Sequence, residues 1–182
     1  MSDKMTPEQR HRCMSHIRSK NTKPEMLVRR YLFAHGFRYR IHVKNLPGKP
    51  DIVLRKYRTV IFVNGCFWHG HEGCGSYSFP KSNVDFWRKK IKRNRERDLQ
   101  ETIALHSMGW HIIRIWECQL KPKVRMATLT SLEYTLNHIF LMNYGHKETE
   151  NKPDEGECQP IVNIEAESSE TYEKRLIKEP KV

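Results

Sequence analysis

No stretch of this sequence approaches the roughly 18 consecutive apolar residues that a membrane-spanning helix requires. The first residues, MSDKMTPEQRHR, lack the apolar segment of a signal peptide, and no internal repeat is visible. Cysteine is scarce, and its count of five is odd, which argues against a purely intramolecular disulfide framework. We therefore expect a cytoplasmic protein with no membrane partner, in which clustered cysteine and histidine favour metal binding over disulfides.

Acidic residues are also scarce over most of the chain. The 182 residues contain 33 Lys and Arg and 21 Asp and Glu, of which residues 145–182 contribute 6 and 10. Residues 1–144 therefore hold 27 basic and 11 acidic residues, a net charge of +16, whereas residues 145–182 carry −4. So basic a body favours a polyanionic partner, by default a nucleic acid, although a solvated basic surface without a specific partner is the alternative. We expect one domain over residues 1–144 and a flexible acidic tail over residues 145–182.

Two helix starts are predicted near the N-terminus. Thr6 can cap a first helix with Pro7 at its first position. Thr22 and Glu25 form a T-x-x-E capping box for a second helix, and Gly36 ends it. The capping role explains Glu25 without any catalytic function.

The middle of the chain predicts strands. FRYRIHV (37–43) alternates apolar and polar residues, as a half-buried strand does. DIVL (51–54) and TVIFVNG (59–65) predict a hairpin whose second strand is apolar on both faces and is therefore central. A long helix over 82–109, started by Ser82 and Asp85 and ended by Gly109, a strand over 110–118 and a helix over 129–142 follow. The order α-α-β-β-β-α-β-α predicts an α/β fold with a mixed central sheet flanked by helices.

The stretch GCFWHGHEGC (65–74) combines residues that bind metals with large aromatic residues. Cys66, His71 and Cys74 offer the thiolate and imidazole ligands that zinc prefers, and Cys118, at the end of the last strand, is the best candidate for a fourth. Such a site would be structural, since four protein ligands leave no open position for water. Buried thiols without metal are the alternative. Two further side chains compete as ligands: His69 and Cys13.

Asp51 follows the turn PGKP and begins a strand. Its carboxylate suits Mg²⁺, which prefers hard oxygen ligands and bridges to phosphate, but it also suits a turn residue that hydrogen-bonds its own backbone. His69 is free for general acid–base chemistry if the zinc site does not use it. Asp98 is a further candidate, or only an i,i+4 partner for basic residues on its helix.

Four separated segments, LPGKPDIV, VIFVNGCFWHGHEGC, FWRKKIKRNRERD and GWHIIRIWEC, together resemble the very short patch repair (Vsr) endonucleases over about residues 5–140. The resemblance implies a variant of the PD-(D/E)xK nuclease fold and a Mg²⁺-dependent endonuclease. It would nick DNA 5′ to the T of a T:G mismatch that arises when 5-methylcytosine deaminates.

The same resemblance implies roles for individual residues. Asp51 and the carbonyl of Val63 would bind Mg²⁺, and His69 would be the catalytic histidine. Glu25 and Asp98 would be polar members of the same site. The structural zinc would be held by Cys66, His71, Cys74 and Cys118.

The sequence departs from the expected pattern at several points. The E-x-K of the wider nuclease fold is absent, which is itself typical of the family and shifts proton transfer towards His69. Val63 and Asn64 stand where Thr and His are expected. A carbonyl ligand survives the first change, but the second removes a proton donor. The loop from His71 to Cys74 is one residue longer than expected.

Aromatic and basic residues surround these motifs. Rigid aromatic side chains can wedge between base pairs, and the resemblance gives this role to Phe67, Trp68 and Trp87, although packing in the core is the ordinary alternative. RKKIKRNRERD carries seven basic residues that could contact phosphates, among them Lys89, Lys90 and Arg93; a solvated face is the alternative.

The sequence therefore predicts a monomeric mismatch endonuclease that acts on double-stranded DNA, with repair proteins as further partners. The alternatives are a zinc-stabilised DNA-binding protein without catalysis and a nuclease of another specificity on the same fold.

Overall fold

The computed structural model describes residues 6–16 and 20–144. The predicted tail lies outside these residues, as does the side chain of Cys13. In chain order the elements are α1 (Pro7–Ser15), α2 (Lys23–Ala34), β1 (Ile52–Leu54), the 3₁₀ turn η1 (Arg55–Tyr57), β2 (Thr59–Asn64), α3 (Val84–Ser107), β3 (His111–Trp116), the 3₁₀ turn η2 (Glu117–Leu120) and α4 (Arg125–Tyr144).

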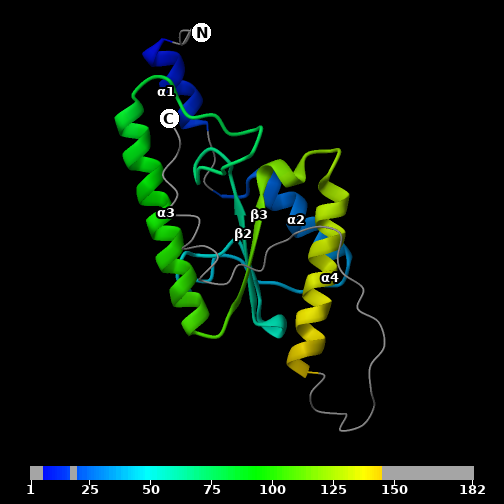
Figure 1. Cartoon of the computed structure of the whole chain (residues 1–182). Coiled ribbons are helices and arrows are strands. Elements are labelled where there is room, and N and C mark those ends of the chain that lie inside the picture. Colours follow the sequence, from blue (N-terminus) through cyan, green and yellow to red (C-terminus); the bar gives the residue numbers. More distant parts are fainter. Residues whose placement is uncertain (1–5, 17–19, 145–182) are drawn as a thin grey trace.

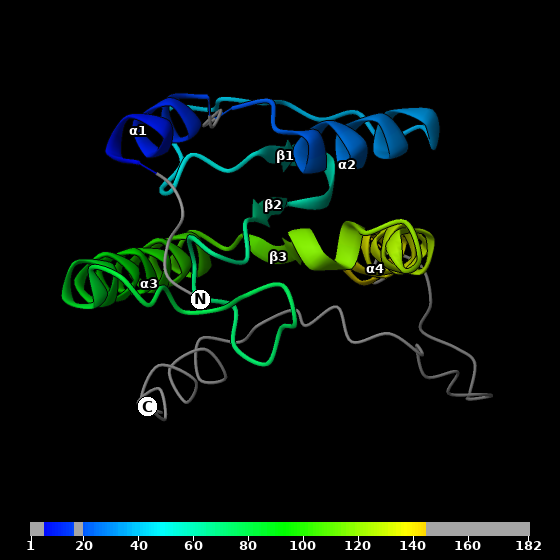
Figure 2. The same ribbon diagram turned by 90° about the horizontal axis from the view of Figure 1, so that it is seen from above.

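The three strands form one mixed sheet in the order β1-β2-β3, so the α/β prediction with a mixed sheet is confirmed. β1 pairs antiparallel with β2, and β2 pairs parallel with β3 in a register that joins Thr59 to His111 and Asn64 to Trp116. β2 is central, as its apolar pattern on both faces predicts. Helices cover both faces, with α3 on one side of the strands and α2 and α4 on the other (Figure 1). The view from above shows the same layers (Figure 2).

The core divides along the alternation of the strands. Ile52, Ile61 and Ile113 are paired neighbours that point to the α2 and α4 face, and they pack with apolar residues of both helices. Val53 and Val60, one residue out of phase, point to the other face, where they pack with Leu105 of α3. The sheet therefore holds α3 on the face opposite to α2 and α4.

The predicted strand over 37–43 is wrong. Only Arg40 pairs with the sheet, through two hydrogen bonds of 2.8 Å with the backbone of Val53. His42 has a φ of +53°, which turns the chain out of the extended conformation. Phe37 is buried all the same, so the alternating pattern follows the burial of side chains without forming a strand.

The predicted helix ends are mostly confirmed. Thr6 caps α1 and Thr22 caps α2, each accepting a hydrogen bond from a backbone N–H three residues on. Gly109 ends α3 with a φ of +73°. The predicted start at Ser82 is wrong, because α3 begins after Asn83, which has a left-handed backbone and makes no capping hydrogen bond through its side chain. No helix within the described ranges is both long and apolar enough to cross a membrane.

Candidate functional site

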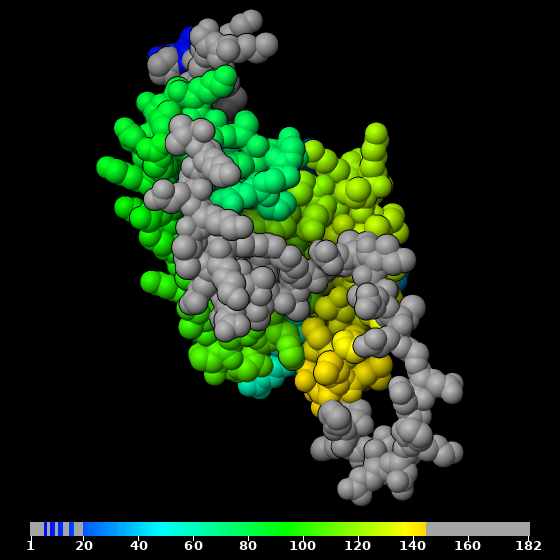
Figure 3. Space-filling view, viewed as in Figure 1, coloured from blue at the N-terminus to red at the C-terminus, as the bar shows by residue number. Residues whose placement is uncertain are grey.

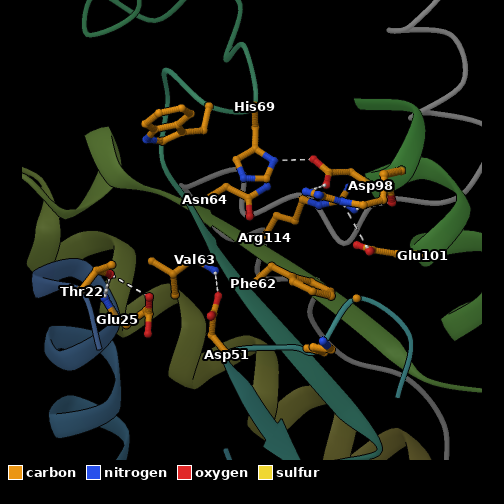
Figure 4. Close-up of a pocket in the computed structure, with 14 residues that line it drawn as sticks. Thr22, Glu25, Asp51, Phe62, Val63, Asn64, His69, Asp98, Glu101 and Arg114 are labelled. Carbon is orange, nitrogen blue, oxygen red and sulfur yellow. Dashed lines mark hydrogen bonds and ion pairs between the residues drawn. The ribbon is translucent and has the colours of Figure 1, made fainter. Parts of the chain in front are cut away.

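A cavity of about 830 Å³ lies where α2, the end of β2 and α3 meet (Figure 4). It brings together the four side chains that the sequence suggested for catalysis, although 73 residues separate the first from the last: Glu25, Asp51, His69 and Asp98. Val63 and Asn64, the last two residues of β2, line the same cavity. The end of the central strand therefore supplies one wall of the site.

The Asp51 carboxylate lies against the central strand. Its Oδ2 accepts a hydrogen bond of 2.8 Å from the backbone N–H of Val63, so this contact joins two strands and not the residues of one turn. Burial raises the pKa of Asp51 from 3.8 to about 6; the Val63 N–H and the charges of Arg29 and His69 lower it, and the charge of Glu25 raises it. Asp51 is therefore an ionised but poorly solvated carboxylate at neutral pH.

Glu25 is buried and serves the start of α2. Its carboxylate accepts hydrogen bonds from the N–H of Asn21 at 3.0 Å and from the Thr22 hydroxyl at 2.9 Å. It also pairs with Arg29 at 3.1 Å, and Arg29 in turn donates to the backbone carbonyl of Asp51 at 3.0 Å. The capping interpretation thus accounts for the hydrogen bonds of Glu25, while its charge still acts on Asp51.

His69 is held by the long helix. Its Nδ1 contacts Oδ2 of Asp98, which is buried on α3, and the two side chains point toward each other in Figure 4. Asp98 pairs with Arg97, its neighbour in sequence, at 3.6 Å. The residues four positions before and after it are Asn94 and Thr102, so an i,i+4 ion pair is not available to it. With Nδ1 engaged by a carboxylate, Nε2 is the nitrogen left for proton transfer.

The four predicted metal ligands come together on the far side of the same loop. The ligand atoms of Cys66, His71, Cys74 and Cys118 all lie within 4.8 Å of one another. Nδ1 of His71 is 3.6 Å from Sγ of Cys66 and 3.5 Å from Sγ of Cys118, and the sulfurs of Cys66 and Cys74 are 3.8 Å apart. Cys118 lies in η2, directly after β3. The group can hold a metal ion, and His69, a competing candidate, lies outside it.

The three thiols of this group differ in acidity. Burial raises the pKa of Cys66 and raises that of Cys118 to about 12, where the hydrogen bonds and charges of the neighbouring thiols act in the same direction. Burial also acts to raise the pKa of Cys74, but hydrogen bonds, among them one from the backbone of Ser76, lower it overall. The His71 ring stacks on Trp116, with centroids 3.9 Å apart and planes 4° from parallel. Buried thiols hold their protons unless a cation replaces them.

The aromatic residues form a partly exposed cluster. The Phe67 ring lies edge-on to Trp68 at 5.3 Å and to Trp87 at 4.9 Å, so the loop after Cys66 packs on the start of α3. Phe86, which the sequence analysis missed, packs on Trp87 at 5.2 Å and is 60% exposed. Because none of the four is fully buried, the cluster is not part of the apolar core.

The basic residues of α3 divide into two groups. Lys89, Lys90 and Arg93 are exposed, and side chains of α3 project along one edge of the molecule in Figure 3. Arg95, by contrast, turns inward and pairs with Glu72 at 2.7 Å. It is therefore part of the packing between α3 and the Cys/His loop.

Sequence reasoning did not place Arg97, Glu101 and Arg114 at the cavity, although it counted Arg97 among the basic residues that could contact phosphates. Arg97 and Glu101 lie one turn apart on α3 and pair at 3.6 Å. Arg114 is buried on β3 and donates to the backbone carbonyl of Asp98 at 3.3 Å and to the hydroxyl of Thr102. A charged residue inside the apolar strand HIIRIW was the available signal for Arg114, because such residues are seldom buried without partners.

Comparison with known proteins gives consistent matches. The family model described as DNA mismatch endonuclease Vsr matches residues 2–75. The type II nicking enzyme V.NmeAIP of Neisseria meningitidis is 52% identical over 123 residues, which cover 68% of this chain and 87% of the relative. V.XorIIP, a type II nicking enzyme of Xanthomonas oryzae, is 46% identical over 139 residues, 76% of this chain and 97% of the relative.

A third relative is named for the activity itself. The DNA mismatch endonuclease Vsr of Escherichia coli K12 is 35% identical over 127 residues, which cover 70% of this chain and 81% of the relative. The matches thus extend over most of each relative, and the family model covers the segments that supply Asp51, His69 and three of the four clustered side chains that could hold a metal ion. The chain therefore belongs to the Vsr family of DNA mismatch endonucleases.

Proposed function

We propose that this chain is a Mg²⁺-dependent endonuclease that nicks DNA on the 5′ side of the T in a T:G mismatch left by deamination of 5-methylcytosine. Membership of the family supports an endonuclease with DNA as substrate, and two of the relatives are named nicking enzymes. The observation that carries the proposal is the cavity in which Asp51 and the His69–Asp98 pair meet, beside exposed aromatic and basic residues. The sheet and its flanking helices would then be a variant of the PD-(D/E)xK nuclease fold.

Asp51 and the backbone carbonyl of Val63 would hold the Mg²⁺. The donor set fits, because Mg²⁺ prefers a carboxylate and other hard oxygens. The raised pKa of Asp51 also fits, since burial beside Glu25 leaves its negative charge poorly compensated and a bound cation would relieve this. When bound, the ion would polarise the phosphate and lower the pKa of a coordinated water.

His69 would move the proton in this reaction. Asp98 fixes the ring through Nδ1, so that Nε2 can accept a proton from the attacking water or give one to the leaving oxygen. Asn64 lines the same cavity but cannot titrate, which leaves His69 as the only histidine among residues 6–16 and 20–144 that lines it. Arg97 and Arg114 would add positive charge at the wall that faces the phosphate.

The group of Cys66, His71, Cys74 and Cys118, called the sulfur cluster below, would hold a structural Zn²⁺. In a tetrahedron with Zn–S bonds of about 2.3 Å and a Zn–N bond of about 2.0 Å, sulfurs lie about 3.8 Å apart and sulfur and nitrogen about 3.5 Å apart. The observed separations of 3.8, 3.6 and 3.5 Å match these values. The ion would join the loop after β2 to η2 and leave no open position for substrate.

The surface beside the cavity would bind the duplex. Phe67, Trp68 and Trp87 would wedge between base pairs at the mismatch, where unstacking costs less than in a matched duplex. The exposed Lys89, Lys90 and Arg93 would contact phosphates and make binding dependent on salt. We propose that residues 1–144 form this nuclease unit, that it acts as a monomer in the cytoplasm, and that other repair proteins are partners.

A strand-resolved nicking assay tests the proposal. End-labelled duplexes carry T:G or C:G at one position in several flanking contexts, and Mg²⁺ is either present or replaced by a chelator. We expect one nick, 5′ to the mismatched T, in the presence of Mg²⁺ only, and no nick with Asp51→Ala. Equal cutting of the matched duplex would instead indicate a nuclease of another specificity. Binding without any cutting would indicate a zinc-stabilised DNA-binding protein.

A further inference from the structure

Three neighbouring side chains of α3 hold the loop that carries His69. Asn94 donates through Nδ2 to the backbone carbonyl of Trp68 at 2.8 Å. Asp98 holds the ring of His69, as described above. Between them, Arg95 contacts the backbone of the loop itself, and the proposed mechanism gives it no role.

Arg95 uses all three of its nitrogens on this loop. Nε donates to the carbonyl of His69 at 3.4 Å, Nη2 donates to the carbonyl of Gly70, and Nη1 pairs with Glu72 at 2.7 Å. We call these four residues the Arg95 clamp. The Arg95 side chain is only 18% exposed, although it belongs to a helix whose neighbouring basic residues face solvent. Its guanidinium thus interacts with groups of the protein itself.

The loop is shaped to accept this arginine. Gly70 is buried and has a φ of +60°, a conformation that side chains rarely adopt. A Cβ at Gly70 would lie 2.8 Å from Nη2 of Arg95 and 2.8 Å from Cγ2 of Ile91. The guanidinium can therefore approach the backbone only because residue 70 is glycine.

The clamp also contains Glu72, one of the two residues between His71 and Cys74. The family resemblance predicts a loop one residue shorter at this point. The Glu72 carboxylate is half-exposed and reaches Arg95 from the solvent side. The pair therefore ties this part of the loop to the same helix that orients the histidine ring.

We propose that Arg95 is a positioning residue, which sets the backbone of His69 and Gly70 so that the His69 imidazole meets the scissile phosphate, and that it does not bind DNA. The inference rests on the proposed function for its link to catalysis. The reaction depends on placement, because an error of about 1 Å in a catalytic group can cost about a hundredfold in rate. His69 would be fixed at its ring by Asp98 and at its carbonyl by Arg95.

Lysine cannot replace this arrangement. A guanidinium presents a planar fork of donors, whereas an ammonium is a single point of charge on a flexible stem. Arg95→Lys would keep the charge and the pair with Glu72 but would not bridge two consecutive carbonyls. If Arg95 instead bound a phosphate, Lys would serve nearly as well.

The test compares Arg95→Lys and Arg95→Ala with Arg93→Ala, an exposed basic residue two positions earlier on the same helix. Single-turnover nicking at saturating DNA gives the rate of the chemical step, and binding across a salt series gives the affinity and its salt slope. We expect Arg95→Ala to nick about a hundredfold more slowly and Arg95→Lys at least about tenfold more slowly. Both should keep the wild-type affinity and salt slope, whereas Arg93→Ala should weaken binding and reduce the slope by about one.

Hydrogen exchange of the DNA-free proteins gives a second readout that needs no activity. The amides of His69, Gly70 and His71 are hydrogen-bonded within the loop at 3.3, 3.3 and 2.9 Å. We expect faster exchange at these amides in both Arg95 variants, with unchanged zinc content and unchanged exchange in β2. This result would support the clamp even if the wild type failed to nick a T:G duplex, so the two proposals can fail separately.

Two results would overturn the inference. One is wild-type nicking and wild-type loop exchange in both Arg95 variants. The other is a defect confined to affinity and salt slope that lysine restores, which would make Arg95 a phosphate contact.

Discussion

Two sites lie at the end of β2: the cavity that Asp51 and His69 line, and the sulfur cluster. They differ in almost every chemical respect. Val63 and Asn64 close the cavity, and Cys66, two residues further along, begins the cluster. The cavity is open and polar and contains Asp51, whose pKa is raised. The cluster offers three thiols and one imidazole, whose ligand atoms all lie within 4.8 Å of one another.

This difference separates two uses of a metal ion. Hard oxygen ligands beside an open cavity suit an ion that exchanges and keeps water, whereas four close N and S ligands suit one that stays and holds the fold. His69 and His71 show the division most clearly. Two residues apart, one faces Asp98 in the cavity and the other faces Cys66 and Cys118 in the cluster.

The sharpest way to separate the two regions is Asp51→Asn. The variant keeps a side-chain oxygen that can accept the Val63 N–H but loses the charge that would hold Mg²⁺. We expect nicking to fall by at least about a thousandfold, while the zinc content stays at one per chain. Rates come from single-turnover assays and zinc from elemental analysis of the same sample. Residual activity near the wild-type level would remove Asp51 from the catalytic site.

Cys118→Ser tests the sulfur cluster. Removal of one ligand should lower the zinc content and cost about 4 kcal/mol or more of stability, which corresponds to a fall in Tm of about 10 °C. Calorimetry measures this, with Cys158→Ser as the control because Cys158 belongs to the predicted tail and is not one of the four predicted ligands. An unchanged Tm together with lost zinc would mean that the cluster does not hold the fold.

The raised pKa of Asp51 predicts a pH dependence on the acid side of neutrality. The folded chain binds this proton more tightly than the unfolded chain, so the contribution of Asp51 to stability is greatest below pH 3.8 and is lost as the pH rises through about 6. The loss amounts to about 3 kcal/mol in the absence of Mg²⁺. About half of it falls between pH 5 and pH 7.5, where urea unfolding of Mg²⁺-free wild type and Asp51→Asn measures it.

Asp51→Asn should remove most of this dependence and should be more stable than the wild type at pH 7.5. Nicking at low Mg²⁺ should fall below about pH 6, where protonated Asp51 cannot bind the ion. Equal pH dependence in the two proteins would place the perturbed carboxylate elsewhere.

The smallest expected effect concerns the support of the cluster. Trp116→Leu removes the ring that stacks on His71, and such stacking contributes about 1 kcal/mol. Zinc should therefore leave for a coloured chelator about fivefold faster, with no change in the Mg²⁺ dependence of nicking. A shift in the Mg²⁺ dependence would show that the two regions are coupled.

The two regions also differ in how well the sequence predicts them. The cluster could be predicted from the sequence because Cys66, His71 and Cys74 are close in the sequence and Cys118 follows a strand that runs beside β2. The central position of β2 could be predicted from its apolar pattern alone. The roles of Asp51 and His69 came from the family resemblance, because each also had an ordinary structural explanation.

Other features depend on tertiary packing and could not be read from local pattern. The alternation in 37–43 reports which side chains are buried, but a left-handed backbone at His42 keeps the segment out of the sheet. Basic residues occur all round the first half of α3, so nothing in the sequence separates the inward Arg95 from the exposed Arg93. Only the structure shows which of them meets the Cys/His loop.

The proposal that Mg²⁺ in the cavity serves catalysis while Zn²⁺ in the sulfur cluster serves the fold is tested most directly by one experiment that follows the two metals separately. The protein is freed of Mg²⁺, its zinc content is measured, and nicking of a T:G duplex is followed as Mg²⁺ is added back. We predict one bound zinc per chain, no nicking before Mg²⁺ is added, and a single nick 5′ to the T afterwards. Nicking that survives without Mg²⁺, or that follows the zinc content, would contradict the account.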